Sequence, residues 1–254
     1  MLSWISYKTI ARKEIVRFLR IWRQTLLPPV ITQTLYFVIF GAFIGSQVRD
    51  INGVSYMAFL VPGLVMMAVI NNSFANVVSS FFGSKFQKNY EELMVSPTPN
   101  RIVVAGYISG GVFRGLLVGF IVFLVSIFFT QIEIYNLPIV FLFVLLTSIL
   151  FSLAGFINAI FSKKFDDISI FSNFVLIPLT YFGGVFYSIK SLPDFWQMAS
   201  RLNPILYMID GFRYGFHGFN DVSLQISLLV IIFLTAFLLL FALYLMKKGI
   251  GLKA

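Results

Sequence analysis

Few side chains in this 254-residue sequence could form a catalytic or metal-binding site. The chain has no Cys, and His217 is its single His. A disulfide, a thiolate nucleophile, a thiolate metal site and a cluster of His ligands are therefore excluded. With no partner to complete a site, His217 is expected to be an interfacial polar residue. No cofactor or metal is expected in this chain.

Acidic side chains could support two other kinds of chemistry. A membrane-embedded enzyme that processes lipids needs convergent acids, bases or metal ligands. An ion-coupled carrier needs acids at mid-depth on its membrane spans. The acids considered for these roles are expected in loops on one side of a membrane: Asp50, Glu133, Asp194, Asp210 and Asp221. Both classes remain alternatives. Lipid turnover without nucleotide would favour the enzyme, and transport that follows an ion gradient without an ATPase would favour the carrier.

The sequence lacks the motif that most commonly binds the phosphates of ATP. No G-x-x-x-x-G-K-[ST] motif occurs, so the chain has no P-loop with which to bind the phosphates of ATP. Any ATP chemistry must come from a partner chain.

The composition indicates an integral membrane protein. The chain is 59% hydrophobic and only 11% charged, with a mean hydropathy of +0.91, which lies far from the balance of a soluble domain. The net charge of +9 does not indicate nucleic-acid binding, because the basic residues lie at the ends of apolar segments.

Six apolar segments are long enough to cross a bilayer, which requires about 20 residues each. We predict an all-α fold with spans at Leu26–Gly45, Val54–Phe82, Ile102–Phe129, Leu137–Phe161, Ile168–Tyr187 and Leu224–Met246.

Lys and Arg in the short loops set the orientation of such a protein. One side carries Lys8, Arg12, Lys13, Arg17, Arg20, Arg23, Lys85, Lys88, Arg101, Lys163, Lys164, Lys247, Lys248 and Lys253. The other side carries only Arg49, Lys190, Arg201 and Arg213. The richer side, with both termini, is predicted to be cytoplasmic.

Residues 1–24 have the pattern of a helix lying in the membrane interface. One face carries Trp4, Tyr7, Ala11, Ile15, Phe18 and Trp22, with Lys13, Arg17 and Arg20 opposite. Such a helix places its rings among the headgroups and its basic face toward anionic lipid. The apolar stretch that follows is too long for the core of a cleaved signal peptide.

The most polar interruption of the apolar sequence is Lys85 to Arg101, within a connecting loop at 83–101. As one helix it is amphipathic, with Phe82, Phe86, Tyr90 and Leu93 on one arc and Lys85, Lys88 and Glu92 opposite. Pro97 and Pro99 then end it. The segment is either a solvated loop or a docking element for a water-soluble partner.

The third span contains close-packing residues and one charge. Gly106, Gly110, Gly111, Gly115 and Gly119 would let another helix approach closely. Arg114 is expected near mid-membrane, about 18 Å along the helix. Two interpretations of Arg114 are open: it contacts a substrate or a lipid headgroup, or it is a buried Arg bonded to carbonyls. Arg114, Gly110, Gly111 and Gly115 are thus candidates for a substrate path or for packing in a dimer.

Two further loops are distinctive. The link at 162–167 places Lys163 and Lys164 at the end of one helix and Asp166 and Asp167 at the start of the next, which complements both helix dipoles. It could also form a second contact with a cytoplasmic partner. The region 188–223 is expected to contain a re-entrant helix that starts at Asn203–Pro204.

Taken together, EELMVSPTP (91–99), the glycine-rich third span with Arg114, and NPILYMIDGFRYG (203–215) resemble the permease subunit of ABC-2 type transporters. The resemblance covers the whole chain, as a single transmembrane domain over 1–254. It is strongest to the bacterial YadH-type inner-membrane permeases.

The resemblance implies an exporter subunit that does not itself hydrolyse ATP. Two copies of a separate ATPase, which bind ATP and Mg²⁺, would drive a homodimer or a pair of permeases in the bacterial inner membrane. The 83–101 loop would be the coupling helix, with Phe86, Lys88, Tyr90, Glu91, Glu92 and Pro97 as its contacts and Lys163, Lys164 and Asp166 as the second contact. Family members export polysaccharides, lipids, drugs or other amphiphiles.

Overall fold

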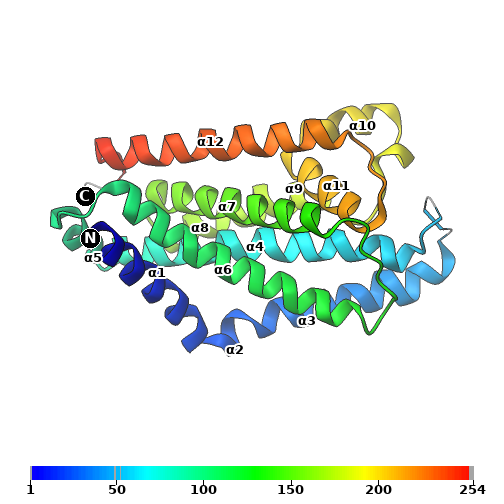
Figure 1. Cartoon of the computed structure of the whole chain (residues 1–254), viewed down its shortest axis with the longest axis horizontal. Coiled ribbons are helices and arrows are strands. Elements are labelled where there is room, and N and C mark those ends of the chain that lie inside the picture. The colour runs from blue at the N-terminus through cyan, green and yellow to red at the C-terminus, as the bar shows by residue number, and fades with distance from the viewer. Residues whose placement is uncertain (1, 49, 52, 252–254) are drawn as a thin grey trace.

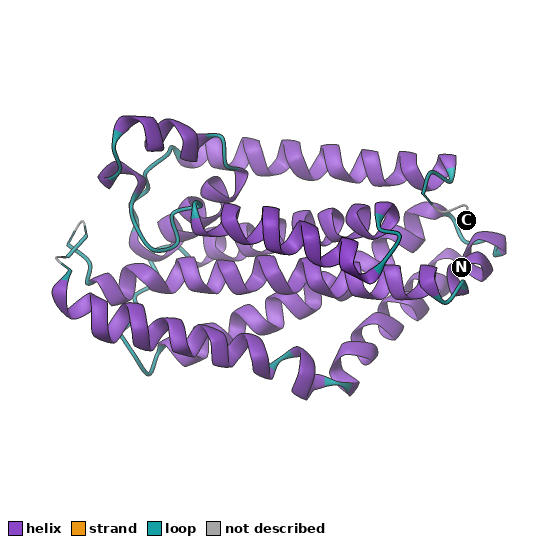
Figure 2. Ribbon diagram, turned by 180° about the vertical axis from the view of Figure 1, so that it is seen from behind, coloured by secondary structure: helices purple, strands orange, loops and turns teal. Residues whose placement is uncertain are grey.

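The computed structural model describes residues 2–48, 50–51 and 53–251. Arg49 and Lys253, which entered the orientation argument, lie outside the described residues. Within those ranges the chain consists of helices joined by short connections, and the one β-type pairing is an isolated bridge between Ile51 and Val54 (Figure 2). The all-helical prediction is confirmed.

Four helices are long and apolar enough to cross a membrane: α4 (Tyr56–Phe86), α6 (Asn100–Ser126), α7 (Leu137–Phe161) and α12 (Leu224–Lys248). They run along the long axis of the molecule (Figure 1). Helix α4 is the centre of the fold, because 83% of its apolar 18-residue stretch is buried, against 17% for α12. The α12 surface is therefore left for lipid or another chain.

The other two predicted spans are helical but not single α-helices. The first is α3 (Leu27–Tyr36) followed by π-helix at Phe37–Ile44 and a 3₁₀ turn at Gly45–Gln47. The fifth is α8 (Phe165–Phe171), π-helix at Ser172–Leu176 and α9 (Ile177–Tyr181). The wider π turns divide each run into α-helices too short to cross a bilayer alone. The count of six spans stays a prediction.

Some of the shorter helices mark the two ends of the bundle. Both termini and α5 (Asn89–Val95) lie at one end, and α10 (Asp194–Arg201) lies at the opposite end (Figure 1). Helices α1 (Leu2–Arg20) and α2 (Trp22–Thr25) lead from the N-terminus to α3. The common end of the two termini agrees with the predicted topology, although the side of the membrane stays a prediction.

The predicted helix start at Asn203–Pro204 is confirmed. Helix α11 (Pro204–His217) begins where the Asn203 side chain accepts a hydrogen bond from the Ile205 amide at 3.0 Å, and it ends at Gly218 with φ 74°. It packs against α4, α7 and α12. Whether it is re-entrant remains a prediction.

The burial of two charged residues in this region was not predicted. Asp210 and Arg213 lie on α11, within the region expected to face outward, and both are buried. Asp210 accepts bonds from the Asp221 and Val222 amides, at 2.8 and 2.9 Å. Arg213 donates to the Gly184 carbonyl at 2.6 Å and lies 4.0 Å from the centre of the Phe59 ring. The packing of α11 on three long helices removes both side chains from solvent.

The glycines of α6 permit close packing within the chain. A Cβ at Gly110 would lie 2.5 Å from the Glu14 Cβ of α1, and one at Gly115 would collide with the Ser73 hydroxyl of α4. Gly111 meets Ser73 and Val77 of α4 and Ser152 of α7 in the same way. The close approach predicted from this ladder is therefore to α1, α4 and α7 of the same chain.

Candidate functional site

Helix α4 does not continue into α5 as the sequence pattern predicted. Lys88 has φ 61° and ψ 6°, a left-handed conformation. The Gln87 amide bonds to the Gly83 carbonyl, and the Lys88 amide bonds to the Lys85 carbonyl, both at 3.0 Å, so α4 closes there. The prediction of one continuous amphipathic helix is therefore wrong, and the cause is a left-handed turn without Gly or Pro to mark it.

This break separates the two aromatic residues that were expected to act together. Phe86, the last residue of α4, is 63% exposed, whereas Tyr90 of α5 is 9% exposed and packs into the core of its own chain. Of the two expected anchors, only Phe86 offers a free ring. The other expected contacts on this link are exposed, namely Lys88, Glu91, Glu92 and Pro97.

The second link, at 162–167, is ordered by its own hydrogen bonds. The Asp167 carboxylate accepts bonds from the Lys163 and Lys164 amides at 2.7 and 2.9 Å. These bonds hold the pKa of Asp167 below its usual range, with the charges of the two lysines adding to the effect. The side chains of Lys163, Lys164 and Asp166 remain exposed.

Lys85 joins the two links. Its ammonium group donates to the Ile160 carbonyl at 2.6 Å and to the Ser162 carbonyl at 2.9 Å, near the C-terminal end of α7. Carbonyls in a last helical turn lack intrahelical partners, so a cation there satisfies them. The ends of α4 and α7 are thereby fixed to each other.

Phe165 was missed by the sequence analysis. Its ring lies 5.0 Å from the Phe86 ring and 4.9 Å from the Phe82 ring, both in edge-to-face contact, and it is 58% exposed. The available signal was a single aromatic residue within the charged link SKKFDD. We call Phe86, Phe165 and the charged side chains of the two links the Phe86–Phe165 surface. Those side chains are Lys88, Glu91, Glu92, Lys163, Lys164 and Asp166.

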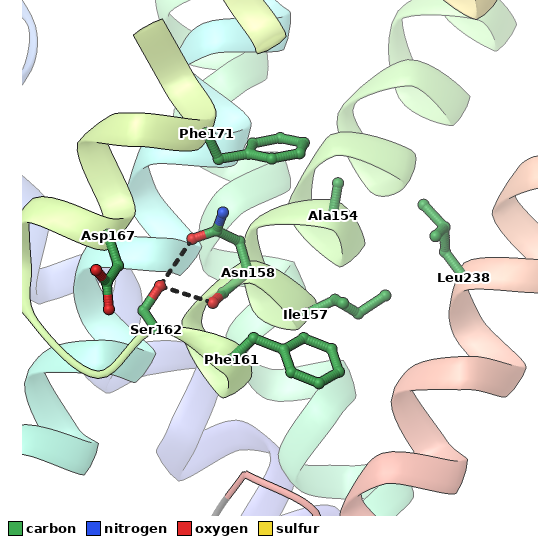
Figure 3. A pocket seen from close by; sticks show the side chains of 8 residues that line it. All are labelled: Ala154, Ile157, Asn158, Phe161, Ser162, Asp167, Phe171 and Leu238. Carbon is green, nitrogen blue, oxygen red and sulfur yellow. Dashed lines mark hydrogen bonds between the residues drawn. The ribbon is translucent and has the colours of Figure 1, made fainter. Parts of the chain in front are cut away.

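A pocket of about 440 Å³ adjoins the second link, between α7, α8 and α12. Figure 3 shows that most of its lining is apolar, with Phe161, Phe171 and Leu238 around the opening. The Ser162 hydroxyl donates to the Asn158 carbonyl and side chain at 2.8 and 3.1 Å. The one charged lining residue, Asp167, is already bonded to two amides. The pocket therefore brings no acid–base pair together.

A polar layer lies inside the bundle, where α1 and α4 meet α6. The Arg114 guanidinium donates to the Thr25 carbonyl and to the Asn72 side chain, both at 3.1 Å. The half-buried Arg114 is thus bonded to one carbonyl and one amide side chain, and a contact with a substrate or lipid headgroup stays a prediction. No group of three or more acids or His that could hold a metal occurs in the described residues.

Glu14 belongs to this layer, although the sequence analysis gave it no role. It is fully buried, with the Arg17 Nε 3.4 Å from its carboxylate. Arg17 in turn donates to the Asn76 carbonyl and side chain, both at 3.0 Å. The fully packed positions of α1 are therefore Ile10, Glu14 and Phe18. Of the expected row, Phe18 is buried, whereas Trp4 and Trp22 are exposed.

These features define a polytopic helical membrane protein with an ordered surface at one end and no assembled catalytic site among its described residues. The chain belongs to the ABC-2 type transporter family, whose family model matches residues 5–217. The resemblance seen in the sequence is confirmed.

Individual relatives agree with this assignment. The chain is 56% identical over 254 residues to the inner membrane transport permease YadH of Escherichia coli strain K12, covering 100% of this chain and 99% of the relative. It is 21% identical over 246 residues to nodulation protein J of Neorhizobium galegae, covering 96% and 93% of the two chains. With nodulation protein J of Rhizobium leguminosarum bv. trifolii the identity is 24% over 217 residues, covering 84% and 80%.

Proposed function

We propose that this chain is the membrane-spanning permease subunit of an ATP-driven exporter in the bacterial inner membrane. Its family, the 56% identity to an inner membrane transport permease and the lack of a P-loop support this role. A separate ATPase binds ATP and Mg²⁺ and hydrolyses the nucleotide. The permease forms the path for an amphiphilic substrate, such as a lipid, glycan or drug.

The working unit is a dimer of permeases with two ATPase copies. Six spans in one chain leave little room for an amphiphile, because α4, α6 and α7 pack directly on one another. A path at or near a subunit interface provides that room. The predicted spans at Leu26–Gly45 and Ile168–Tyr187 complete the six, and both termini lie in the cytoplasm.

The observation that carries this proposal is the Phe86–Phe165 surface. Phe86 and Phe165 belong to two links that are about 80 residues apart in sequence. Their exposed rings are in contact, and charged side chains surround them. An apolar centre with a polar rim is the usual anatomy of a protein-binding surface. Lys85 fixes the two links together, so a force applied to either is passed to both α4 and α7.

The test is binding of the cognate ATPase, together with nucleotide-driven export, for Phe86→Ala and Phe165→Ala. Loss of an aromatic anchor costs about 2 kcal/mol or more, so each variant should weaken docking at least about tenfold. Lys88→Ala should have far less effect, because an exposed charge contributes about 1 kcal/mol or less.

Phe195→Ala is the matched control. Phe195 is 72% exposed on α10, at the end of the molecule opposite α5 (Figure 1). It should bind and export like the wild type. If Phe86→Ala and Phe165→Ala also behave like the wild type, these links are solvated loops and the ATPase docks elsewhere.

A further inference from the structure

An apolar groove of about 660 Å³ runs between α1, α6, α7 and α12. Along α6 it extends from Arg101 to Leu116, about 22 Å at 1.5 Å per residue. One leaflet of a bilayer contributes about 15 Å of hydrocarbon. The groove is therefore long enough for one acyl chain and the headgroup above it. It starts at the end of the molecule where both termini lie (Figure 1).

The chemistry of the groove changes along its length. Its inner part is lined by aliphatic and aromatic side chains, among them Ile108, Val112, Phe113 and Leu239. The Tyr7 hydroxyl and the Ser109 hydroxyl, 2.8 Å apart, lie about midway along the groove, since Ser109 is about 12 Å from Arg101 along α6. Arg101, in the first turn of α6, is exposed at the mouth. An apolar trough with a cation at its mouth matches an amphiphile that carries an anionic group.

The mouth is positively charged. Helix α1 lines the groove with Tyr7, Ala11 and Ile15, and the exposed Lys8 and Arg12 follow two of these residues directly. On a helix with 3.6 residues per turn they flank the lining face. The single acid of α1, Glu14, is buried against Gly110 on a different face. No acid lines the groove within the described residues. The net charge at the mouth therefore selects an anion.

Aromatic side chains mark the same level. The exposed Trp4 ring stacks on Tyr7 at 5.5 Å, and the Lys8 ammonium lies 5.2 Å from the Trp4 ring. Trp and Tyr concentrate at the headgroup level of membranes, where the ring is partly dry and its polar atom is wet. The mouth therefore lies at the depth where a lipid phosphate lies.

We propose that this groove binds one anionic phospholipid of the surrounding membrane, with an acyl chain between α6 and α12 and the phosphate near Arg101 and Lys8. The groove shares no residue with the Phe86–Phe165 surface. The bound lipid fills the space between α1, α6 and α12 and adds contacts to an N-terminal helix that already packs on α6. This inference goes beyond the proposed transport function and does not depend on it.

The experiment is native mass spectrometry of the purified full-length chain in a non-denaturing detergent. The protein is given equal amounts of phosphatidylglycerol and phosphatidylcholine with identical acyl chains. We expect one retained phosphatidylglycerol per chain. Arg101→Gln should reduce its retention about fivefold, the effect of removing one cation near a lipid phosphate. Equal retention of the two lipids by the wild type would overturn the proposal.

Arg201→Gln is the matched control, because Arg201 is an exposed arginine on α10, at the other end of the chain. It should retain phosphatidylglycerol like the wild type. Equal losses in Arg101→Gln and Arg201→Gln would mean that only the net charge matters, which contradicts a site.

Two further variants test the groove itself. Ala105 is half-buried in the lining, so Ala105→Phe should exclude the acyl chain and abolish retention, and undiminished retention would contradict the proposal. Because the chain has no Cys, Phe113→Cys introduces a unique thiol at an exposed lining position. Efficient disulfide-linked dimers of this variant in native membranes would show that a second copy covers the groove, and the lipid proposal would fail.

Discussion

Arg114 is a charge inside the bundle that is held by groups from two other parts of the chain. Asn72 of α4 and the Thr25 carbonyl each accept one hydrogen bond from it. Asn72→Ala leaves the guanidinium with one protein partner, and a hydrogen bond to a charged group contributes about 2 kcal/mol. We expect the variant to lose about that much stability in thermal unfolding of the detergent-solubilised protein. Asn173→Ala, at an exposed position, should unfold like the wild type.

The outcome for Asn72→Ala also bears on function. If stability is unchanged while transport falls, Arg114 is held by something other than Asn72, and the substrate-contact interpretation gains support. If stability and transport fall together, the polar layer has a structural role.

Asp167 is expected to make the stability of the folded chain depend on pH, and the direction of that dependence follows from its pKa. Hydrogen bonds from two backbone amides favour its charged form and lower its pKa in the folded chain. A lowered folded-state pKa adds stability at pH values above the unfolded-state pKa of about 3.9. That contribution is lost as the pH falls through the folded-state pKa.

Carboxyl carbon NMR of labelled aspartates measures this directly. The titration midpoint of the Asp167 signal should lie below about 3.9, which is the usual pKa of a free Asp. The amide signals of Lys163 and Lys164 should shift over the same pH range. A midpoint at or above the usual value would show that the two amides do not bond to this carboxylate in solution.

At the scale of elements, the α6 glycines allow a matched pair of substitutions. A side chain at Gly115 collides with Ser73 of α4, whereas a Cβ at Gly83 meets nothing within 4 Å. Gly115→Val should destabilise the protein by about 2 kcal/mol, as expected for overpacking. Gly83→Ala should be neutral or stabilising by up to about 1 kcal/mol, because Ala is the better helix former. Thermal unfolding measures both, and equal unfolding temperatures for the two variants would contradict intramolecular packing of this ladder.

The helices themselves could be predicted because length, hydropathy and caps are local properties. The start of α11 at Asn203–Pro204 follows from the side chains present there. The end of α4 could not be predicted in this way. The left-handed residue is Lys88, and neither Gly nor Asn marks the position. Tertiary contacts, including those of Lys85 with α7, hold that turn in place.

The packed face of α1 could not be predicted from the sequence either. Ile10, Glu14 and Phe18 form one row, and Trp4, Tyr7, Ala11 and Ile15 form another, each with a spacing near four residues. In a soluble protein the apolar row would be the buried one. At a membrane both rows have an acceptable partner, because lipid tails are as apolar as a protein core. Glu14 was missed for this reason, and Phe165 was missed because its contact with Phe86 joins distant links.

At the scale of the whole molecule, the distribution of charge predicts which end faces the cytoplasm. Both termini and α5 lie at one end, and α10 lies at the other (Figure 1). Most of the Lys and Arg residues lie in segments at the first end, and cytoplasmic loops carry an excess of these residues. The end with the termini should therefore face the cytoplasm.

Since the chain has no Cys, single cysteines report this orientation without background. In intact cells, cysteines at Gln47, Ile132 and Asp194 should react with a membrane-impermeant maleimide, whereas cysteines at Asn89 and Lys164 should react only after lysis. Asn89 and Lys164 are both exposed, so protection in intact cells cannot come from burial. Labelling of either position from outside would show that the predicted orientation is reversed. The Phe86–Phe165 surface would then face away from cytoplasmic ATP, and the ATPase could not dock there.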